Sequence, residues 1–166
     1  MAAAGHYLAT ASAFRILEQG GNAVDAGVAA GITLNVVLPQ YTSFAGVAPI
    51  LIHHVGKQET VTISGLGRWP KAASIEYFNQ HHGGNLPAGI MRTVTPAAAD
   101  AWMTSIKLYG TMTFEQVVTP ALELAEGGFP IPASLHRALS RAGDAFVGDE
   151  GGGLPWPSTQ EIFVPG

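Results

Sequence analysis

The sequence predicts an α+β fold that is mainly helical and carries one short β-hairpin. Apolar residues recur at helical spacing over much of the 166-residue chain. Two β-like runs, 49–55 and 58–64, lie next to each other between the helical stretches. Because two strands alone leave both edges of a sheet uncovered, the predicted fold is incomplete.

Composition limits the classes of function. Apolar residues make up 47% of the chain and charged residues only 12%, which is low for a soluble domain. One explanation is a surface covered by a partner subunit or by the rest of a longer polypeptide. The net charge of −4, without a basic stripe, argues against nucleic-acid binding. The absence of cysteine excludes disulfides, thiol nucleophiles and thiolate metal sites.

The stretch GGNAVDAGVAAGITLNVVLPQ, residues 20–40, invites comparison with a phosphate loop, a membrane span and a buried helix. A phosphate loop needs a preceding strand together with a Walker lysine or a third glycine at the dinucleotide spacing, and this stretch has neither. The apolar run 23–38 is shorter than the about 20 residues of a membrane span, and it contains the charged Asp25. A core helix is therefore predicted.

The glycine pair at the start of this stretch predicts a corner between two helices. A first helix over 9–19 is expected to close at Gly20 and Gly21, since glycine readily adopts the left-handed conformation that ends helices. Asn22 is expected to cap the second helix, and Asp25 to complement its dipole. GGNAVDA is therefore interpreted as a scaffold corner that touches no substrate directly.

The middle of the chain predicts the hairpin and then a further helix. Gly56 and Lys57 separate the two β-like runs, which indicates a two-residue turn. Further along, Thr95 is expected to cap a helix over 97–109, with Pro96 at its first position.

The last part of the chain predicts more helix and then a tail. Thr113 and Gln116 form a capping-box pattern for a helix that ends near a glycine pair and carries a kink at Pro120. A further helical stretch is predicted over 134–146. The Gly- and Pro-rich segment 148–166 is expected to be a loop-like tail.

The residues alone indicate no self-contained active site. No nucleophile elbow, zinc-binding helix motif or calcium loop occurs. The pairs His53-His54 and His81-His82 suggest a metal site, but neighbours on a strand point to opposite faces and cannot converge on one ion. Solvated or core histidines are the preferred interpretation, so no metal and no cofactor are expected. The carboxylates form no obvious pair for acid–base chemistry.

Five stretches carry a resemblance to a known family: GHYLAT (5–10), ILEQGGNAVDAGVAA (16–30), VVLPQ (36–40), TVTPAAADAW (93–102) and GTMTFEQVVTPALELAEGGFPI (110–131). Through them the chain resembles the N-terminal part of the larger subunit of the γ-glutamyltransferase (γ-glutamyltranspeptidase) family. The similarity runs in register over nearly the whole chain.

The resemblance implies that residues 1–166 are an incomplete part of an N-terminal nucleophile hydrolase, an αββα sandwich. Such proteins are made as a precursor that cuts itself, and the new N-terminal threonine of the smaller subunit is both nucleophile and, through its amine, base. That threonine would lie beyond residue 166, so no catalytic residue is assigned here. The implied reaction transfers a γ-glutamyl group from an amide such as glutathione to water or an amino acid.

Two departures from the family pattern concern substrate binding. Tyr41 and Thr42 stand where the family carries a serine pair. Leu66, four residues before Pro70, stands where the family carries the arginine that pairs with the donor α-carboxylate, and leucine cannot form that pair. Arg68 is the candidate substrate-binding residue in its place, because on an extended segment it faces the same side as Leu66. An ordinary surface arginine is the alternative.

Three classes of function stay open. The first is a γ-glutamyltransferase-like amide hydrolase or acyltransferase. The second is an acylase acting on non-glutamyl amides, favoured by Leu66 and the apolar Phe44 and Trp69. The third is a non-catalytic relative that kept the scaffold. The expected partners are the smaller subunit or the rest of the precursor and a small-molecule amide, with no nucleic acid and no membrane span. A cytoplasmic location is favoured because no secretory signal is visible.

Overall fold

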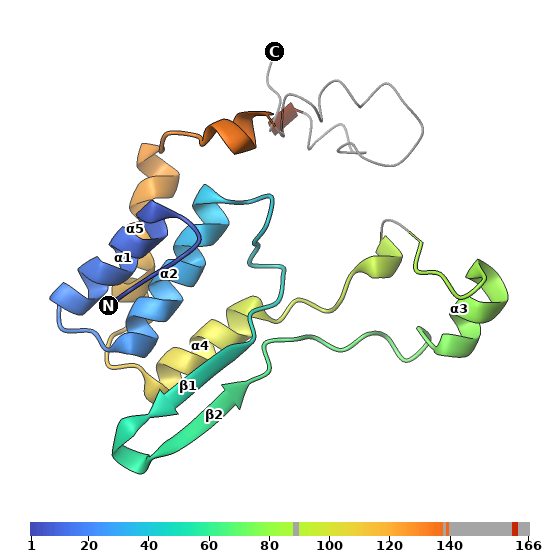
Figure 1. Ribbon diagram of the computed structural model, residues 1–166, viewed down its shortest axis with the longest axis horizontal. Coiled ribbons are helices and arrows are strands. Elements are labelled where there is room, and N and C mark those ends of the chain that lie inside the picture. Colours follow the sequence, from blue (N-terminus) through green and yellow to red (C-terminus); the bar gives the residue numbers. More distant parts are fainter. Residues whose placement is uncertain (88–89, 138, 140–160, 163–166) are drawn as a thin grey trace. The chain divides into compact units, whose positions relative to one another are not determined.

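The computed structural model describes residues 1–87, 90–137, 139 and 161–162. It divides the chain into two compact units, 1–129 and 130–166, and all the labelled helices and strands belong to the first (Figure 1). In the second unit, residues 133–137, 139 and 161–162 are helical. A helix was predicted over 134–146, and the rest of it lies outside the described residues. The loop-like tail predicted over 148–166 also lies outside them, except for residues 161 and 162, which are helical.

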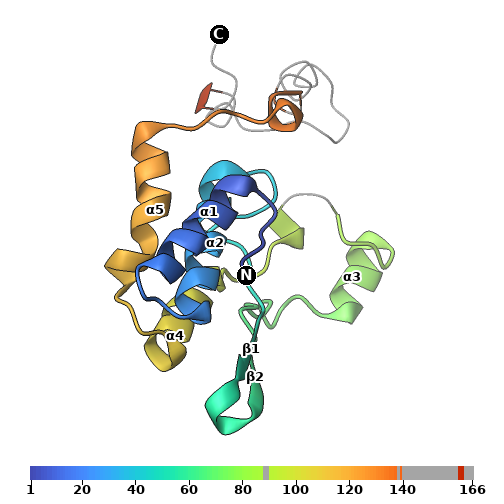
Figure 2. The same ribbon diagram turned by 60° about the vertical axis from the view of Figure 1, so that its left-hand side comes forward.

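Four helices build the core of the first unit. They are α1 (Tyr7–Glu18), α2 (Ala23–Val37), α4 (Ala98–Tyr109) and α5 (Phe114–Gly127). Helix α2 is central, because it packs against each of the other three (Figures 1 and 2). Its buried face carries Val28, Ala29 and Ile32, which confirms the predicted core helix. No helix among the described residues is long and apolar enough to cross a membrane.

The corner between α1 and α2 has the predicted geometry. Gly20 has a positive φ of 91°, which is the backbone conformation expected of a helix-ending glycine. Gly21 lies where the chain passes closely between two side chains: a Cβ there would come within 2.7 Å of both Ile16 Cγ2 and Met112 Sδ. Asn22 caps α2 and forms a capping box with Asp25. The glycine pair therefore allows α1, α2 and the start of α5 to approach one another.

The hairpin consists of β1 (Ile50–His54) and β2 (Glu59–Ile63), paired antiparallel with Ile52 opposite Val61. The prediction of a two-residue turn is wrong, because a short 3-10 helix, Val55–Lys57, and the left-handed Gln58 connect the strands. The His54 ring accepts a hydrogen bond from the Lys57 amide at 3.2 Å and so caps that 3-10 turn. The His54 side chain therefore stabilises the connection between the strands.

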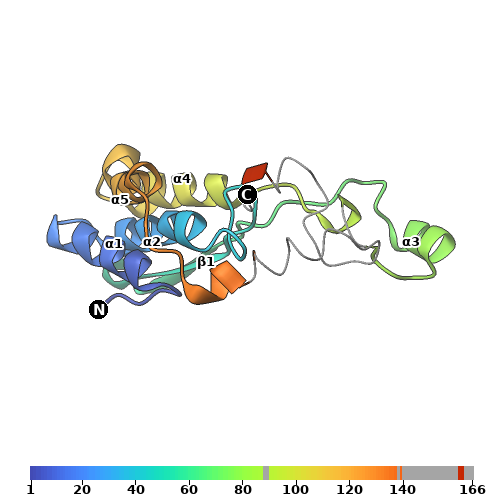
Figure 3. The same cartoon turned by 90° about the horizontal axis from the view of Figure 1, so that it is seen from above.

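Helix α3 (Ile75–His82) was not among the predicted elements. Ser74 caps it by accepting a hydrogen bond from the Tyr77 amide, and Gly83 ends it with a φ of +58°. Together with a 3-10 turn, Ile90–Arg92, it lies apart from the four core helices at the end of two extended segments (Figures 1 and 3). The first of these segments follows β2 and carries the predicted binding residue.

The starts of α4 and α5 differ in how well the sequence predicts them. The predicted cap at Thr95 is wrong: α4 begins after Ala97, and no side chain caps it. The carbonyl of Gly46 instead accepts hydrogen bonds from the amides of Ala97 and Ala98 at 3.0 and 3.1 Å. By contrast, the capping box of Thr113 and Gln116 is confirmed at the start of α5. Pro120 lies inside α5, as expected, and the kink there stays a prediction.

Candidate functional site

The corner between α1 and α2 is a polar clamp on the loop between α4 and α5. The Asn22 side-chain amide donates to the Tyr109 carbonyl at 2.7 Å. The Asp25 carboxylate accepts hydrogen bonds from the Asn22 amide at 2.9 Å and from the amide and hydroxyl of Thr111 at 3.1 and 2.7 Å. The Met112 amide donates to its other oxygen at 3.4 Å. This network joins residues that lie more than eighty positions apart.

The electrostatics of this clamp favour the ionised form of Asp25. Burial raises the pKa of the fully buried Asp25 carboxyl, but the hydrogen bonds donated by Asn22, Thr111 and Met112 outweigh burial and hold the pKa below its ordinary value. Asp25 is therefore ionised at neutral pH, with donors around both oxygens. The Asp25 side chain is fully buried, whereas Gly20 and Ala23 of the same corner are exposed.

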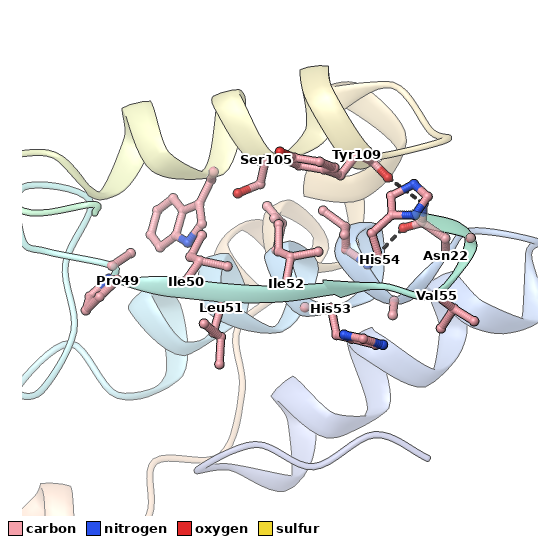
Figure 4. Close-up of a pocket in the computed structure, with 17 residues that line it drawn as sticks. Asn22, Pro49, Ile50, Leu51, Ile52, His53, His54, Val55, Ser105 and Tyr109 are labelled. Atoms are coloured by element: carbon pink, nitrogen blue, oxygen red, sulfur yellow. Dashed lines mark hydrogen bonds between the residues drawn. The ribbon is translucent and has the colours of Figure 1, made fainter. Parts of the chain in front are cut away.

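A groove of about 610 Å³ lies between β1, α2 and α4 (Figure 4). Ile50, Ile52 and His54 point into it towards α4, while Leu51 and His53 point to the opposite side of the strand. Its helical walls are largely apolar and include Val28 and Trp102; Ser105 already donates to the carbonyl of Ala101 at 2.7 Å. Among the described residues no hydrogen bond joins Ser105 to His53 or His54, so the groove shows no paired nucleophile and base.

Two of the four paired histidines, His53 and His81, are exposed, whereas His54 and His82 are half-buried; the buried Nε2 of His82 has no hydrogen-bond partner among the described residues. His53 and His54 lie on opposite faces of β1, which confirms that they do not converge (Figure 4). The His53 ring lies 3.0 Å from the Thr60 hydroxyl, and the His81 ring lies 2.9 Å from the carbonyl of Tyr77, one helical turn earlier. Within the residues that the structure describes, no group of three or more histidine or acidic side chains is placed to hold a metal ion.

The segment after β2 presents Leu66 and Arg68 to the outside. Both side chains are exposed, and they alternate with the half-buried Gly67 and Trp69 in the pattern of an extended chain. Gly67 is pressed against the second extended segment, so closely that a Cβ there would overlap the Thr95 carbonyl. The Thr95 hydroxyl donates to the carbonyl of Arg68 at 2.7 Å and fixes the backbone at this position.

The Arg68 guanidinium is available to bind a ligand. It forms no ion pair and no hydrogen bond with the described part of the chain, and its side chain is exposed. Two other arginines are engaged: Arg15 pairs with Glu123 at 2.5 and 2.9 Å, and Arg92 donates to the Leu86 carbonyl at 3.1 and 3.0 Å. The role of Arg68 in substrate binding stays a prediction.

A second, smaller hollow begins at the residue after Arg68. This α3 pocket has a volume of about 380 Å³. It is lined by Trp69, Pro70, Ala72, Ala73, Tyr77, Phe78, Ile90, Met91 and Thr93. The rings of Trp69 and Phe78 lie 5.8 Å apart, and Phe78 is buried. Phe44, which like Trp69 is expected from the sequence to favour an acylase, packs edge-on against Trp102 of the core.

The sequence reasoning missed the α3 pocket because it missed α3. The signals that could have found the helix are the capping residue Ser74, the acidic Glu76 in the first turn and the helix-ending Gly83. With α3 in place, Phe78 falls on the inner face and meets Trp69.

The family of this chain follows from its similarity to known proteins. The family model described as Gamma-glutamyltranspeptidase matches residues 9–166. The chain belongs to the γ-glutamyltranspeptidase family. The glutathione hydrolase-like YwrD proenzyme of Bacillus subtilis is 35% identical over 80% of this chain. The chain spans 25% of the length of that relative.

Two solved structures show the same fold. The Helicobacter pylori γ-glutamyltranspeptidase superposes with a TM-score of 0.79 at 27% identity, covering 98% of this chain and 46% of that chain. The cephalosporin acylase of Bacillus halodurans superposes with a TM-score of 0.73 at 28% identity, covering 87% of this chain and 27% of that one. The four helices and the hairpin are therefore part of the N-terminal nucleophile hydrolase fold, as the resemblance implied.

Proposed function

We propose that this chain is the N-terminal part of the larger subunit of an amide hydrolase and acyltransferase that matures by cutting its own precursor. The observation that carries the proposal is membership of the γ-glutamyltranspeptidase family over residues 9–166. The matched YwrD relative is named as a proenzyme, and this chain spans a quarter of it. The low charge content and the uncovered hairpin support a chain that packs against more protein.

The proposed chemistry uses a nucleophile outside this chain. The hydroxyl of the N-terminal threonine of the smaller subunit attacks the amide carbonyl while its own amine takes the proton. The carbon–nitrogen bond of the substrate then breaks. The amine part of the substrate takes the proton from the threonine amine and leaves, while the acyl group stays on the threonine hydroxyl as an ester. Water or an amino-acid amine attacks the ester, releases the acyl product and restores the hydroxyl.

In this proposal, the present chain supplies binding groups for the acyl donor. The exposed guanidinium of Arg68, which has no partner among the described residues, suits a carboxylate because its paired N–H groups can donate to both oxygens. The hydrogen bond from Thr95 to the Arg68 carbonyl limits backbone movement at that position. A γ-glutamyl donor carries such an α-carboxylate, so Arg68 is the residue proposed to bind it.

A second candidate is an acylase that acts on amides without this carboxylate. Leu66 favours it, since this side chain is 57% exposed and offers no charge. The likeness to a structure named cephalosporin acylase also supports it. The two candidates differ in whether the donor must carry an α-carboxylate.

Enzyme expressed from the whole reading frame tests the proposal with γ-glutamyl p-nitroanilide. We expect Arg68→Gln to lower kcat/KM by about tenfold to a hundredfold, the effect of losing a charged hydrogen bond. Lys71→Gln is the matched control, because it removes one positive charge from the same segment, and it should leave kcat/KM unchanged. Equal activity of both variants would contradict the role of Arg68. Turnover confined to amides without the carboxylate would favour the acylase.

A further inference from the structure

We infer that the α3 pocket is a subsite for an uncharged, ring-sized apolar group of the amide substrate. This inference rests on the proposed function and specifies the substrate class: amides that carry an aromatic or branched aliphatic group. Of the lining residues only Trp69 carries an earlier expectation, as an apolar residue that favours an acylase.

The chemistry of the lining supports an apolar ligand. The pocket is lined by three aromatic rings, aliphatic side chains and Thr93, with no charged residue among them. The Thr93 hydroxyl is already engaged, since it donates to the Ile90 carbonyl at 2.7 Å. The volume of about 380 Å³ falls within the range of about 300–1,000 Å³ that is usual for small-molecule sites. A charged group would lose its hydration there without gaining a partner.

The rings give the pocket a defined shape. Tyr77 meets Phe78 edge-on with ring centres 5.5 Å apart, and the tilted Trp69 ring lies 5.8 Å from that of Phe78. Aromatic rings favour offset and edge-on neighbours, so this arrangement suits a further ring. The Trp69 indole N–H is buried and has no hydrogen-bond partner within the described residues. A ligand with a carbonyl beside its ring could supply the missing acceptor.

The location connects the pocket with the proposed donor site. Trp69 directly follows Arg68, and consecutive Cα atoms lie about 3.8 Å apart. On this extended segment Arg68 is exposed while Trp69 faces inward. The pocket and the exposed guanidinium therefore lie on opposite sides of the same short segment. Because the pocket is built from residues 69–93 alone, its shape is local to this part of the chain.

Binding and turnover of the mature enzyme together test the inference. The binding probe is para-fluorophenylacetamide, followed by fluorine NMR; the substrates are phenylacetyl p-nitroanilide and γ-glutamyl p-nitroanilide. Ala73→Trp and Thr93→Trp fill the pocket from two walls, so one remains informative if the other fails to fold. Gln80→Trp is the matched control, because it adds the same indole to an exposed position of α3 outside the pocket.

We expect the probe to bind the wild-type enzyme and Gln80→Trp equally. Each pocket-filling variant should weaken binding by about tenfold or more and lower kcat/KM for the phenylacetyl substrate in parallel. No binding to the wild-type enzyme, as when another part of the protein fills the pocket, would overturn the inference. Equal binding to all variants would also overturn it. Selective loss of binding without turnover of either anilide would uphold the pocket and contradict the proposed function.

Discussion

At the scale of single residues, Asp25 shows how one carboxylate ties distant parts of the chain together. It closes the capping box of its own helix and also accepts hydrogen bonds from Thr111 and Met112 in the loop between α4 and α5. Gly110 leaves room for this contact, since a Cβ there would lie 2.5 Å from the carboxylate. The capping role is readable from sequence. The contacts to the loop cannot be read in this way, because they join residues 86 and 87 positions apart.

Replacing Asp25 with asparagine should destabilise the protein. In the wild type, both carboxylate oxygens of Asp25 accept hydrogen bonds from N–H and O–H groups. Asparagine replaces one of these oxygens with an NH₂ group, so some of the donors lose their acceptor, at a cost of about 1–3 kcal/mol. Asp100→Asn is the control, because Asp100 is exposed in the first turn of α4. Urea unfolding measures the difference in free energy of unfolding. Equal stability of the two variants would contradict the clamp.

The lowered pKa of Asp25 also predicts how stability depends on pH. The unfolded chain takes up a proton near the ordinary aspartate pKa of about 3.9, whereas the folded carboxylate resists protonation until a lower pH. The contribution of Asp25 is therefore complete above that value and is lost as pH falls through the folded pKa. Acid titration of unfolding free energy should be less steep for Asp25→Asn over this interval than for the wild type. Parallel curves would contradict the prediction.

At the scale of elements, the glycines of α2 and its entry have different roles. Gly21 sits where a Cβ would meet Ile16 and Met112, and Gly31 approaches the Trp102 indole, with 3.1 Å from its Cβ position to Nε1. Both positions set the distance between packed helices. Gly27 lies exposed inside α2 with nothing within 4 Å of its Cβ position. Packing in this structure therefore does not require glycine at position 27.

Alanine substitutions at Gly21 and Gly27 should therefore have opposite signs. Gly21→Ala is expected to destabilise the protein by about 1–3 kcal/mol through overpacking. Gly27→Ala should stabilise it by about 0.5–1 kcal/mol, because alanine loses less conformational freedom in a helix. Differential scanning calorimetry gives both shifts in Tm, and shifts of the same sign would disprove the distinction.

The sequence predicts elements well where the signal is local. The corner at Gly20, the cap at Asn22 and the capping box at Thr113 depend on neighbouring residues, and all are confirmed. The start of α4 depends on the carbonyl of Gly46, some fifty residues earlier, and a local cap at Thr95 was predicted in its place. The Arg68 segment was found only through the family resemblance, and the α3 pocket depends on packing between segments that no local pattern shows.

At the scale of the whole molecule, the hairpin is a two-stranded sheet that pairs with no further strand among the described residues. It has only two strands among the described residues, and its outward-facing Leu51 is 73% exposed. Two strands are rarely stable alone, and the open edges of a sheet are usually paired or covered. The two-stranded sheet agrees with the proposal that the chain assembles with further parts of a γ-glutamyltranspeptidase-like protein.

Restoring the family arginine should strengthen γ-glutamyl binding in that assembled enzyme. Leu66→Arg places a guanidinium at the exposed position beside Arg68, and we expect kcat/KM for γ-glutamyl p-nitroanilide to rise by about tenfold. Leu66→Met is the control, since it keeps the apolar character. An unchanged value for Leu66→Arg would show that this position does not reach the donor.

The central claim is that this chain is part of an enzyme that matures by self-cleavage, and mass spectrometry tests it most directly. The protein is expressed from its whole reading frame, denatured and weighed, and the N-terminus of every product is sequenced. We predict two chains, the second of which begins with threonine, because that residue must be free to act as nucleophile and base. A single uncut chain would contradict the claim and favour a relative that kept the scaffold without the chemistry.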